Sequence, residues 1–217
     1  MSIALSLTDA QIERYSRQIL LPEIGGRGQA RLLAAHVALA GAGEAAAAAA
    51  VLLGRAGVGA LDLLAHGGRL PELGPDCRLR RLALTDAAAV VSEVDVLVDL
   101  AGDGELTATL GRRALAAGRP LIVGVLADAR AVVATLVGRP CVACLPRAVL
   151  ALEGRGASGR FAAPAALAAG ALAASETLAA LLFPPSQGRL HTLACGDGIF
   201  AAEPLPPTTG CSVCGSR

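Results

Sequence analysis

Short apolar runs alternate with stretches of helix-forming composition along most of the chain. The apolar runs occupy residues 36–40, 60–64, 95–100 and 121–126, with a further strand expected near 78–84. Helices are expected between them, at residues 44–55, from about 86, and up to about 117. Strands that alternate with helices pair in parallel through right-handed crossovers. The pattern therefore predicts a Rossmann-like α/β fold with a doubly wound, mainly parallel sheet.

The two ends of the chain depart from this alternation. Thr8 and Gln11 form a capping-box sequence that starts a helix to about residue 20, and a second helix runs to about residue 35 after the breakers Pro22, Gly25 and Gly26. Beyond Ala129 we expect a long helix at 164–182 and strands near 131–137, 190–195 and 199–202. The chain is interpreted as one domain over 1–217, comprising an arm (1–35), a core (36–128) and a C-terminal part (129–217).

Composition narrows the possible classes of protein. The chain is 54% hydrophobic and 17% charged, which excludes a disordered protein, and 19 basic residues balance 18 acidic ones, which gives no case for a nucleic-acid partner. Every basic residue is Arg, and neither Lys nor Asn occurs. A mechanism that needs a lysine ammonium therefore cannot run on this chain alone.

The most apolar long segment runs from residue 161 to 183 and contains Pro164, Gly170 and Glu176. These residues favour a buried amphipathic helix over a membrane span. Residues 1–7 lack the basic start of a secretory signal. We therefore expect a cytoplasmic protein without a membrane partner.

Four cysteines give the strongest chemical signal. Cys141 and Cys144 form one C-x-x-C pair, and Cys211 and Cys214 form a second. Two such pairs can place four thiolates around one ion, which predicts a structural zinc site with no open coordination position. Two redox pairs, or disulfides of a secreted protein, are the alternatives. The isolated Cys77 and Cys195 are expected to be small apolar residues.

A glycine turn follows the first strand. Gly41-x-Gly43-x-x-Ala46 fits the relaxed phosphate-binding fingerprint at the start of a helix. Two details oppose a nucleotide there: Glu44 stands in the first helical turn, and Ala65 follows the second strand where a ribose-binding acid is expected. Asp62 lies inside that strand. A phosphate site and a turn kept for packing both stay open.

The N-terminal string then identifies a family. Arg14-Tyr15-Ser16-Arg17-Gln18-Ile19-Leu20-Leu21-Pro22 is followed by Gly25, Gly28-Gln29 and Leu32. Further matching stretches are Gly41-Ala-Gly43, Arg55-Ala56-Gly57-Val58-Gly59, Gly138-Arg139-Pro140-Cys141-x-x-Cys144-Leu145 and Gly210-Cys211-x-x-Cys214-Gly215. Over nearly its whole length the chain resembles the ThiF/MoeB/HesA family, the bacterial relatives of ubiquitin-activating enzymes.

The resemblance implies that the chain binds ATP and magnesium. It also implies adenylation of the C-terminal Gly-Gly of a ubiquitin-like sulfur carrier. It also implies a dimer in which an N-terminal arginine reaches the neighbouring subunit's nucleotide. Arg17 matches that arginine and Asp103 the magnesium-binding acid, so both are candidate catalytic residues. Gly41, Gly43 and Arg14 are the candidate nucleotide-binding residues.

The chain departs from the family at the nucleotide site. Ala65 replaces the ribose-binding acid, and the lysine has no counterpart. The segment that should carry it is reduced to a loop at 67–76, where Arg69 is the basic residue. Asp103 is followed by Gly104 and is one position out of register, which also suits a helix N-cap. No cysteine that could act in catalysis occurs at 154–163.

These departures leave two main hypotheses. In the first, the ATP site is degenerate and the chain is a carrier-binding module, or the inactive partner of an active adenylyltransferase in a heterodimer. In the second, it is an active adenylyltransferase in which Arg69 or Arg78 covers the phosphates. The dimer that the resemblance implies is a homodimer or a heterodimer with an active family member. Loss of one preorganised charge-stabilising group typically costs about 2.7–4 kcal/mol, which favours the first. A nicotinamide-dependent oxidoreductase is disfavoured by Ala65 and the cysteine pairs.

Overall fold

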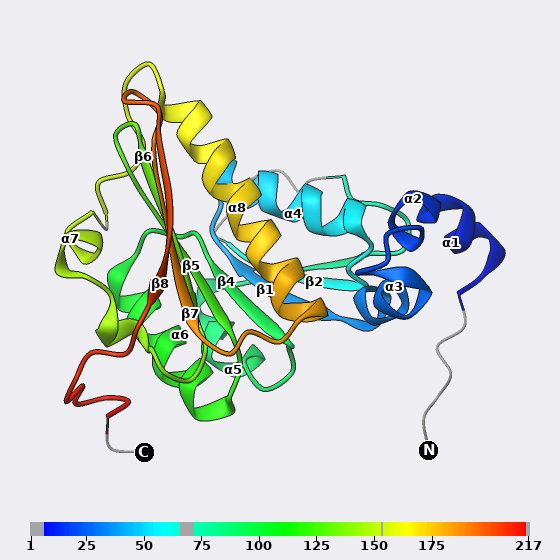
Figure 1. Ribbon diagram of the computed structural model, residues 1–217, viewed down its shortest axis with the longest axis horizontal. Coiled ribbons are helices and arrows are strands. Elements are labelled where there is room, and N and C mark those ends of the chain that lie inside the picture. Colours follow the sequence, from blue (N-terminus) through cyan, green and yellow to red (C-terminus); the bar gives the residue numbers. More distant parts are fainter. Residues whose placement is uncertain (1–6, 66–71, 153, 216–217) are drawn as a thin grey trace.

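The computed structural model describes residues 7–65, 72–152 and 154–215. Their strands form one eight-stranded sheet in the order β3-β2-β1-β4-β5-β6-β7-β8 (Figure 1). The pairs among the first five strands of that order are parallel, and β5 to β8 pair in antiparallel fashion. The strands are β1 (His36–Ala40), β2 (Ala60–Leu64), β3 (Arg78–Leu82), β4 (Val96–Asp99), β5 (Leu121–Ala127), β6 (Arg130–Leu136), β7 (Gly188–Ala194) and β8 (Ile199–Leu205).

Helices cover both faces of the sheet. α4 and α8 contribute to the core on one face, and α5, α6 and α7 to the core on the other. The helices are α1 (Asp9–Arg14), α2 (Ser16–Ile19), α3 (Gly25–Ala34), α4 (Glu44–Ala56), α5 (Ala87–Val90), α6 (Gly104–Ala117), α7 (Arg147–Leu150) and α8 (Ala162–Leu182), with 3-10 turns at Leu84–Asp86 and Val142–Cys144. The doubly wound, mainly parallel sheet with a C-terminal extension is confirmed, whereas the division into 1–35, 36–128 and 129–217 stays a prediction.

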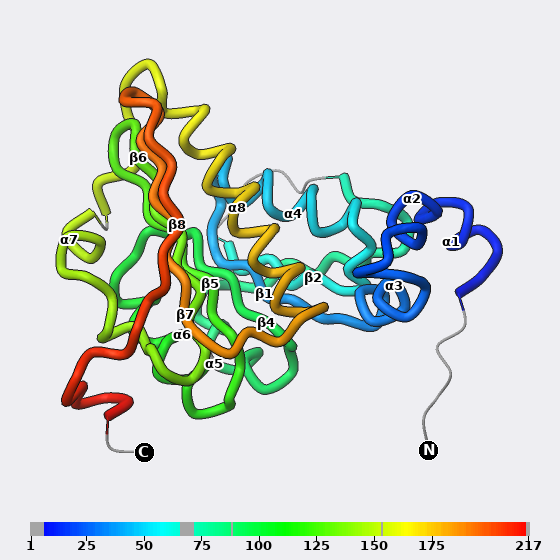
Figure 2. Tube along the Cα trace, viewed as in Figure 1, coloured from blue at the N-terminus to red at the C-terminus, as the bar shows by residue number. Residues whose placement is uncertain are grey.

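The N-terminal arm differs in detail from its prediction. The Thr8 capping box is present, but the first helix is interrupted at Tyr15, which buries its side chain, so that α1 and α2 are separate. Gly25 begins α3 instead of breaking a helix. In the tube of Figure 2 this arm lies at one end of the molecule, and the cysteine-bearing C-terminal segment lies at the other.

The long helix α8 packs on one face of the sheet and belongs to the hydrophobic core there. By length and composition Ala162–Leu182 could span a membrane, but 56% of its most apolar window is buried inside the molecule. It packs closely on α4, since a Cβ atom at Gly170 would lie 2.3 Å from the Ala45 carbonyl oxygen. We expected an amphipathic helix, but α8 is apolar on its outer side as well, where Leu167 is 52% exposed.

Glu176 and Asp62 are carboxylates inside otherwise apolar elements, and each is held by polar partners. Glu176 of α8 accepts hydrogen bonds from Thr135 (2.6 Å) and Arg189 (3.0 Å), and His191 Nε2 lies 2.9 Å from it. Asp62 of β2 is 1% exposed and accepts two hydrogen bonds from the guanidinium of Arg80. Buried charges persist only when they are paired, and these partners let each acid sit in the core.

Candidate functional site

The glycine turn lies at the carboxyl edge of the parallel strands, between β1 and α4. Gly41 has φ +132°, and a Cβ atom there would lie 2.9 Å from the Leu100 carbonyl oxygen, so packing alone demands this glycine. Gly43 has φ −87°, and a Cβ atom there would meet nothing within 4 Å. The space at Gly43 is open, as a phosphate-binding turn requires.

The N-terminus of α4 has no side-chain cap, because its N-cap residue is Gly43. Uncapped amides and the positive end of the helix dipole together favour an anion. Glu44, in the first turn, supplies a negative charge of the chain's own. The turn therefore offers space and amide donors for a phosphate, with a carboxylate beside it that opposes one.

Two aspartates stand at the carboxyl end of the neighbouring strand β4, which ends with Asp99 and is followed by Asp103. Asp99 is buried and accepts hydrogen bonds from the Ala101 amide (3.1 Å) and the Thr107 hydroxyl (2.6 Å). Asp103 is exposed and accepts from the amides of Glu105 and Leu106, at 2.9 and 3.1 Å. The expected N-cap role of Asp103 on α6 is confirmed. Its role toward magnesium stays a prediction.

The end of β2 carries no acid. Ala65 follows the strand and is 5% exposed, and its amide donates to the Leu82 carbonyl at 3.2 Å. Arg69, a hypothetical phosphate ligand, lies outside the described residues. Arg78, the other one, begins the edge strand β3 and is exposed. Neither arginine is therefore placed at the glycine turn by the described part of the chain.

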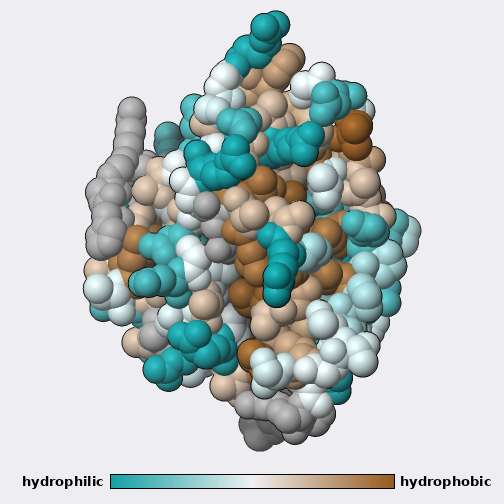
Figure 3. Space-filling view, turned by 90° about the vertical axis from the view of Figure 1, so that its left-hand side faces the viewer, coloured by the Kyte–Doolittle hydropathy of each residue, from teal (hydrophilic) through white to brown (hydrophobic). Residues whose placement is uncertain are grey.

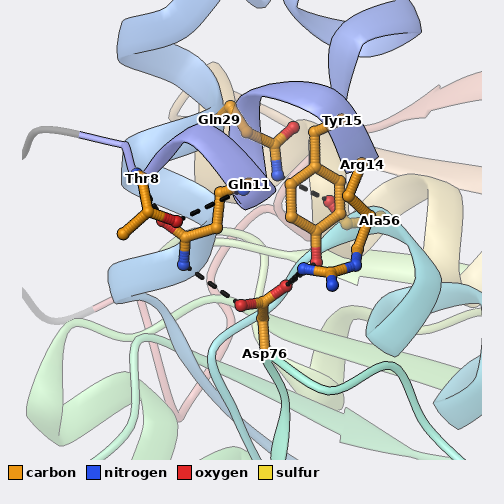
Figure 4. A network of polar contacts seen from close by, with 7 residues as sticks. All are labelled: Thr8, Gln11, Arg14, Tyr15, Gln29, Ala56 and Asp76. Atoms are coloured by element: carbon orange, nitrogen blue, oxygen red, sulfur yellow. Dashed lines mark hydrogen bonds and ion pairs between the residues drawn. The ribbon is translucent and has the colours of Figure 1, made fainter.

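The N-terminal motif forms a joint between the arm and the core (Figure 4). Asp76 accepts hydrogen bonds from Gln11 Nε2 (3.1 Å) and the Tyr15 hydroxyl (3.0 Å), and its carboxylate pairs with Arg14. Burial disfavours the charged form of Asp76, but these hydrogen bonds and the Arg14 charge outweigh it and lower its pKa below the usual value. Arg14 is thus committed to Asp76, and its contact with a nucleotide stays a prediction.

The other family stretches complete this joint. Gln29 is fully buried, and its Nε2 donates to the Ala56 carbonyl at 3.1 Å. Gly57 has φ +91°, and a Cβ atom there would lie 2.4 Å from Gln29 Nε2 and 3.0 Å from the Tyr15 ring. The motif residues Tyr15, Gln29 and Gly57 therefore pack together and hold the arm against the C-terminal end of α4.

Arg17 makes none of the contacts of this joint. Its residue is exposed, and it makes no hydrogen bond or ion pair with any residue that the structure describes. A guanidinium with this freedom can engage a group outside its own chain.

The four predicted metal ligands are brought together by the fold. Cys141 and Cys144 follow β6 and Cys211 and Cys214 follow β8, all four are buried, and their sulfur atoms lie within 4.8 Å of one another. The Cys141–Cys211 and Cys144–Cys214 sulfur distances are 3.8 and 3.6 Å. Zinc–sulfur bonds of about 2.3 Å at tetrahedral angles require sulfurs about 3.8 Å apart, and a disulfide would need about 2.05 Å. The four cysteines could therefore hold one metal ion.

The surroundings of these cysteines also suit a metal site. The Thr208 amide lies 3.3 Å from Cys144 Sγ and donates to it. A Cβ atom at Gly215 would lie 2.4 Å from the Cys211 carbonyl oxygen, so the turn that carries Cys211 and Cys214 requires a glycine at this position. Hydrogen bonds to sulfur stabilise thiolates and orient ligands around a metal.

Sequence reasoning missed Asp76 and the partners of Glu176 and Asp62. A single charge inside an otherwise apolar strand or helix must find a partner, so Asp62 and Glu176 carried a usable signal. Asp76 sits in a loop among glycines and prolines, where an acid is ordinary, and the sequence offered no signal for it.

The chain is similar to several known proteins. The adenylyltransferase and sulfurtransferase MOCS3 of Bos taurus is 31% identical over 250 residues, which cover 98% of this chain and 55% of that protein. The sulfur carrier protein adenylyltransferase of Thermus thermophilus is 28% identical over 256 residues, covering 97% of this chain and 93% of that protein. The heterocyst protein HesA of Trichormus variabilis is 42% identical over 82 residues, or 38% of this chain and 29% of that protein. No protein-family model matches the chain.

Solved structures agree on the fold. MccB of E. coli superposes with a TM-score of 0.73 at 18% identity, over 97% of this chain and 76% of MccB. A structure of MccB with ATP gives a TM-score of 0.70 at 18% identity, over 93% of this chain and 74% of MccB. The sheet, the glycine turn and the four-cysteine site thus define a protein of the ThiF-like α/β class. With the N-terminal motif and the relatives named above, the chain belongs to the ThiF/MoeB/HesA family, and it spans 55% of the length of its bovine relative.

Proposed function

We propose that this chain acts with a ubiquitin-like sulfur carrier through a degenerate ATP site, either as a carrier-binding module or as the inactive subunit of a heterodimer with an active adenylyltransferase. In the heterodimer, Arg17 would reach the nucleotide of the active subunit. The observation that carries the proposal is an intact, well-seated arm with a free Arg17, beside a nucleotide edge where Ala65 stands for the acid and the chain contains no lysine.

The loss of rate expected without the lysine and the ribose-binding acid supports an inactive nucleotide site. Nucleotidyl transfer depends on positioned cations and hydrogen-bond donors that stabilise developing charge. Each such group typically accounts for about 10²–10³ in rate. Losing the lysine and the ribose-binding acid together leaves little catalysis, even where the two losses are not additive.

An exposed apolar surface supports contact with a carrier protein. Figure 3 looks onto the side of the molecule that carries β8 and α7, and apolar residues gather in the middle of this face with polar ones around them. On the edge strand β8, Ile199 and Phe200 are 53 and 58% exposed. Large exposed apolar side chains of this kind mark interaction surfaces. The Thermus relative is named for its action on a sulfur carrier protein, which suggests the chemistry of the partner.

The deciding experiment mixes this chain with an active family member and a carrier ending in Gly-Gly, and measures carrier adenylation. We expect the chain to be inactive alone and to raise the rate of its partner, and Arg17→Ala to abolish the increase. An unchanged increase with Arg17→Ala would remove the arginine from the mechanism. Calorimetry with ATP on the chain alone gives a separate measure of the degenerate site.

The second candidate function is an active adenylyltransferase, favoured by the open space at Gly43 and the uncapped N-terminus of α4. Pyrophosphate exchange by the chain alone, with ATP, magnesium and a carrier, would establish it. Gly43→Ala is the sharpest variant, because the new methyl group meets no protein atom yet fills the approach of a phosphate. An exchange activity that Gly43→Ala abolishes, without loss of folding, would favour this candidate over the first.

For the cysteine site we propose zinc. Four thiolates complete a tetrahedral shell, so the ion would be structural and would bind neither substrate nor water. Cys141, Cys144, Cys211 and Cys214 would hold it and join the ends of β6 and β8. Metal analysis of the purified chain, with one zinc per chain expected, tests this assignment.

A further inference from the structure

The first part of the arm, residues 7–24 with α1 and α2, is attached to the rest of the chain with little apolar burial, whereas α3 buries Leu32 in the core. Neither α1 nor α2 buries a residue, and Tyr15 between them is the one buried side chain of the described residues 7–24. Three apolar side chains of this first part are exposed, with Ile12, Leu20 and Leu21 respectively 47, 80 and 48% exposed. Burial of apolar surface stabilises a contact in proportion to its area. The position of the arm must therefore depend largely on its polar contacts.

Those polar contacts converge on one residue. Among the described residues, every side-chain hydrogen bond that leaves residues 8–20 for the rest of the chain ends on Asp76. Gln11 donates to Oδ1, while Tyr15 and Arg14 donate to Oδ2 (Figure 4). The Asp76 side chain is only 16% exposed, so solvent competes weakly for these donors. A hydrogen bond to a charged acceptor is also roughly twice as strong as a neutral one.

Asp76 is itself fixed by the core. It stands two residues before β3, which pairs with β2 over five registered positions. On the arm side, the Tyr15 ring fits against Gly57, where a side chain would not fit. Arg17 follows two residues after Tyr15 and has no partner among the described residues. Where the Arg17 guanidinium points is therefore set by how Tyr15 and α1 are held.

We propose that Asp76 is a positioning residue, which holds α1 and Tyr15 against the core and so fixes where Arg17 is presented to a partner subunit. This inference rests on the proposed function, because it assumes that Arg17 acts at a neighbouring nucleotide site. Asp76 itself touches no reacting group. Its effect on activity passes through the arm.

The test uses the full chain with Asp76→Ala, Asp76→Glu and Arg17→Ala, and Glu203→Gln as the control for hydrogen exchange. Glu203 is an exposed carboxylate on β8, far from the arm in the sheet order. One readout is hydrogen exchange of the amides of residues 9–20. The other is the stimulation of an active family member, measured against the concentration of this chain, which separates the maximal rate from the affinity of the two chains.

Asp76→Ala is expected to speed exchange in the arm and to lower the maximal stimulation about 10²-fold, the usual effect of misplacing a catalytic group. Metal content and exchange in the core should not change. Asp76→Glu should recover part of both readouts, because it keeps the charge. Arg17→Ala should lose stimulation while the exchange of the arm stays as in the parent chain.

Three results would overturn the inference. Unchanged exchange of the arm in Asp76→Ala would show that Asp76 does not hold it. A released arm with full stimulation would remove the positioning role and leave the proposed function standing. No stimulation by the parent chain would refute the proposed function, and with it any role of Asp76 in presenting Arg17, whatever the exchange data show.

Discussion

The alkaline titration of Tyr15 gives a direct measure of the joint between arm and core. Tyr15 is the one tyrosine of the chain and there is no tryptophan, so a single phenol dominates the near-ultraviolet spectrum. Burial, followed by the hydrogen bond and the charge of Asp76, raises the pKa of Tyr15 from 10.0 to about 12. At pH 11 we therefore expect about one-tenth of the phenol to be ionised, against about nine-tenths for an exposed tyrosine.

The same shift predicts how stability depends on pH. A raised phenol pKa means that folding favours the protonated form, so the contribution is complete below pH 10 and is lost as pH rises toward 12. Two units correspond to about 2.7 kcal/mol at about 1.36 kcal/mol per unit. Denaturant unfolding at pH 9 and pH 11 should differ by about half of this, ~1.3 kcal/mol, because pH 11 lies midway between the two pKa values. Tyr15→Phe should remove this part of the pH dependence.

Substitution of Asp76 separates the two causes of the shift. Asp76→Ala should lower the midpoint partway toward 10 if the ring stays buried, and fully to about 10 if the ring leaves its seat. Glu203→Gln should titrate like the parent chain. A parent midpoint near 10, with circular dichroism showing a folded protein at that pH, would refute the burial of Tyr15 against Asp76.

Three further predictions test the fold and the metal site. Gly59→Ala should cost more than about 4 kcal/mol of unfolding free energy, because its Cβ atom would lie 1.9 Å from the Leu33 carbonyl oxygen. Gly43→Ala, whose Cβ atom meets nothing, should cost about 1 kcal/mol or less in the same denaturant titration. Removing the metal with a chelator should lower the thermal midpoint, and Cys144→Ser should prevent stoichiometric binding while Cys77→Ser leaves metal content unchanged. Burial opposes the charge of Asp62 and Glu176, but their hydrogen bonds and cationic partners outweigh it and lower both pKa values. Their contribution to stability should therefore be complete above about pH 5 and be lost as the pH falls below it. Urea titrations at pH 7 and pH 3 should differ less in Asp62→Asn than in the parent chain.

The parallel core could be predicted because its signals are local. β1 and β2 are observed at 36–40 and 60–64, the bounds expected from two apolar runs with glycines beside them. The cluster of four cysteines, which could hold a metal ion, was predictable for a related reason, since the spacing within each pair lets two sulfurs meet one ion. The two pairs can be read directly from the sequence, and the sheet order explains how these distant segments meet.

The arm could not be predicted to the same detail, because its break at Tyr15 depends on a residue 61 positions away. A helical composition through residues 9–19 gives no sign that the chain must turn to bury one ring. The pairing of Asp62 with Arg80 likewise depends on the register of β2 and β3, which no local pattern fixes. Long-range polar contacts thus account for most of what the sequence alone did not show.

The cysteine site has a topological consequence. Cys141 and Cys211 lie 70 residues apart, and α7, α8, β7 and β8 all fall between the two pairs. An ion on the four sulfurs makes this segment a closed ring, a cross-link whose loop entropy alone is worth about 4 kcal/mol by analogy with a disulfide. The ion is exchangeable, however, so the strength of this cross-link rises with the logarithm of the free metal concentration. The supply of metal around the protein would thereby set the stability of its C-terminal third.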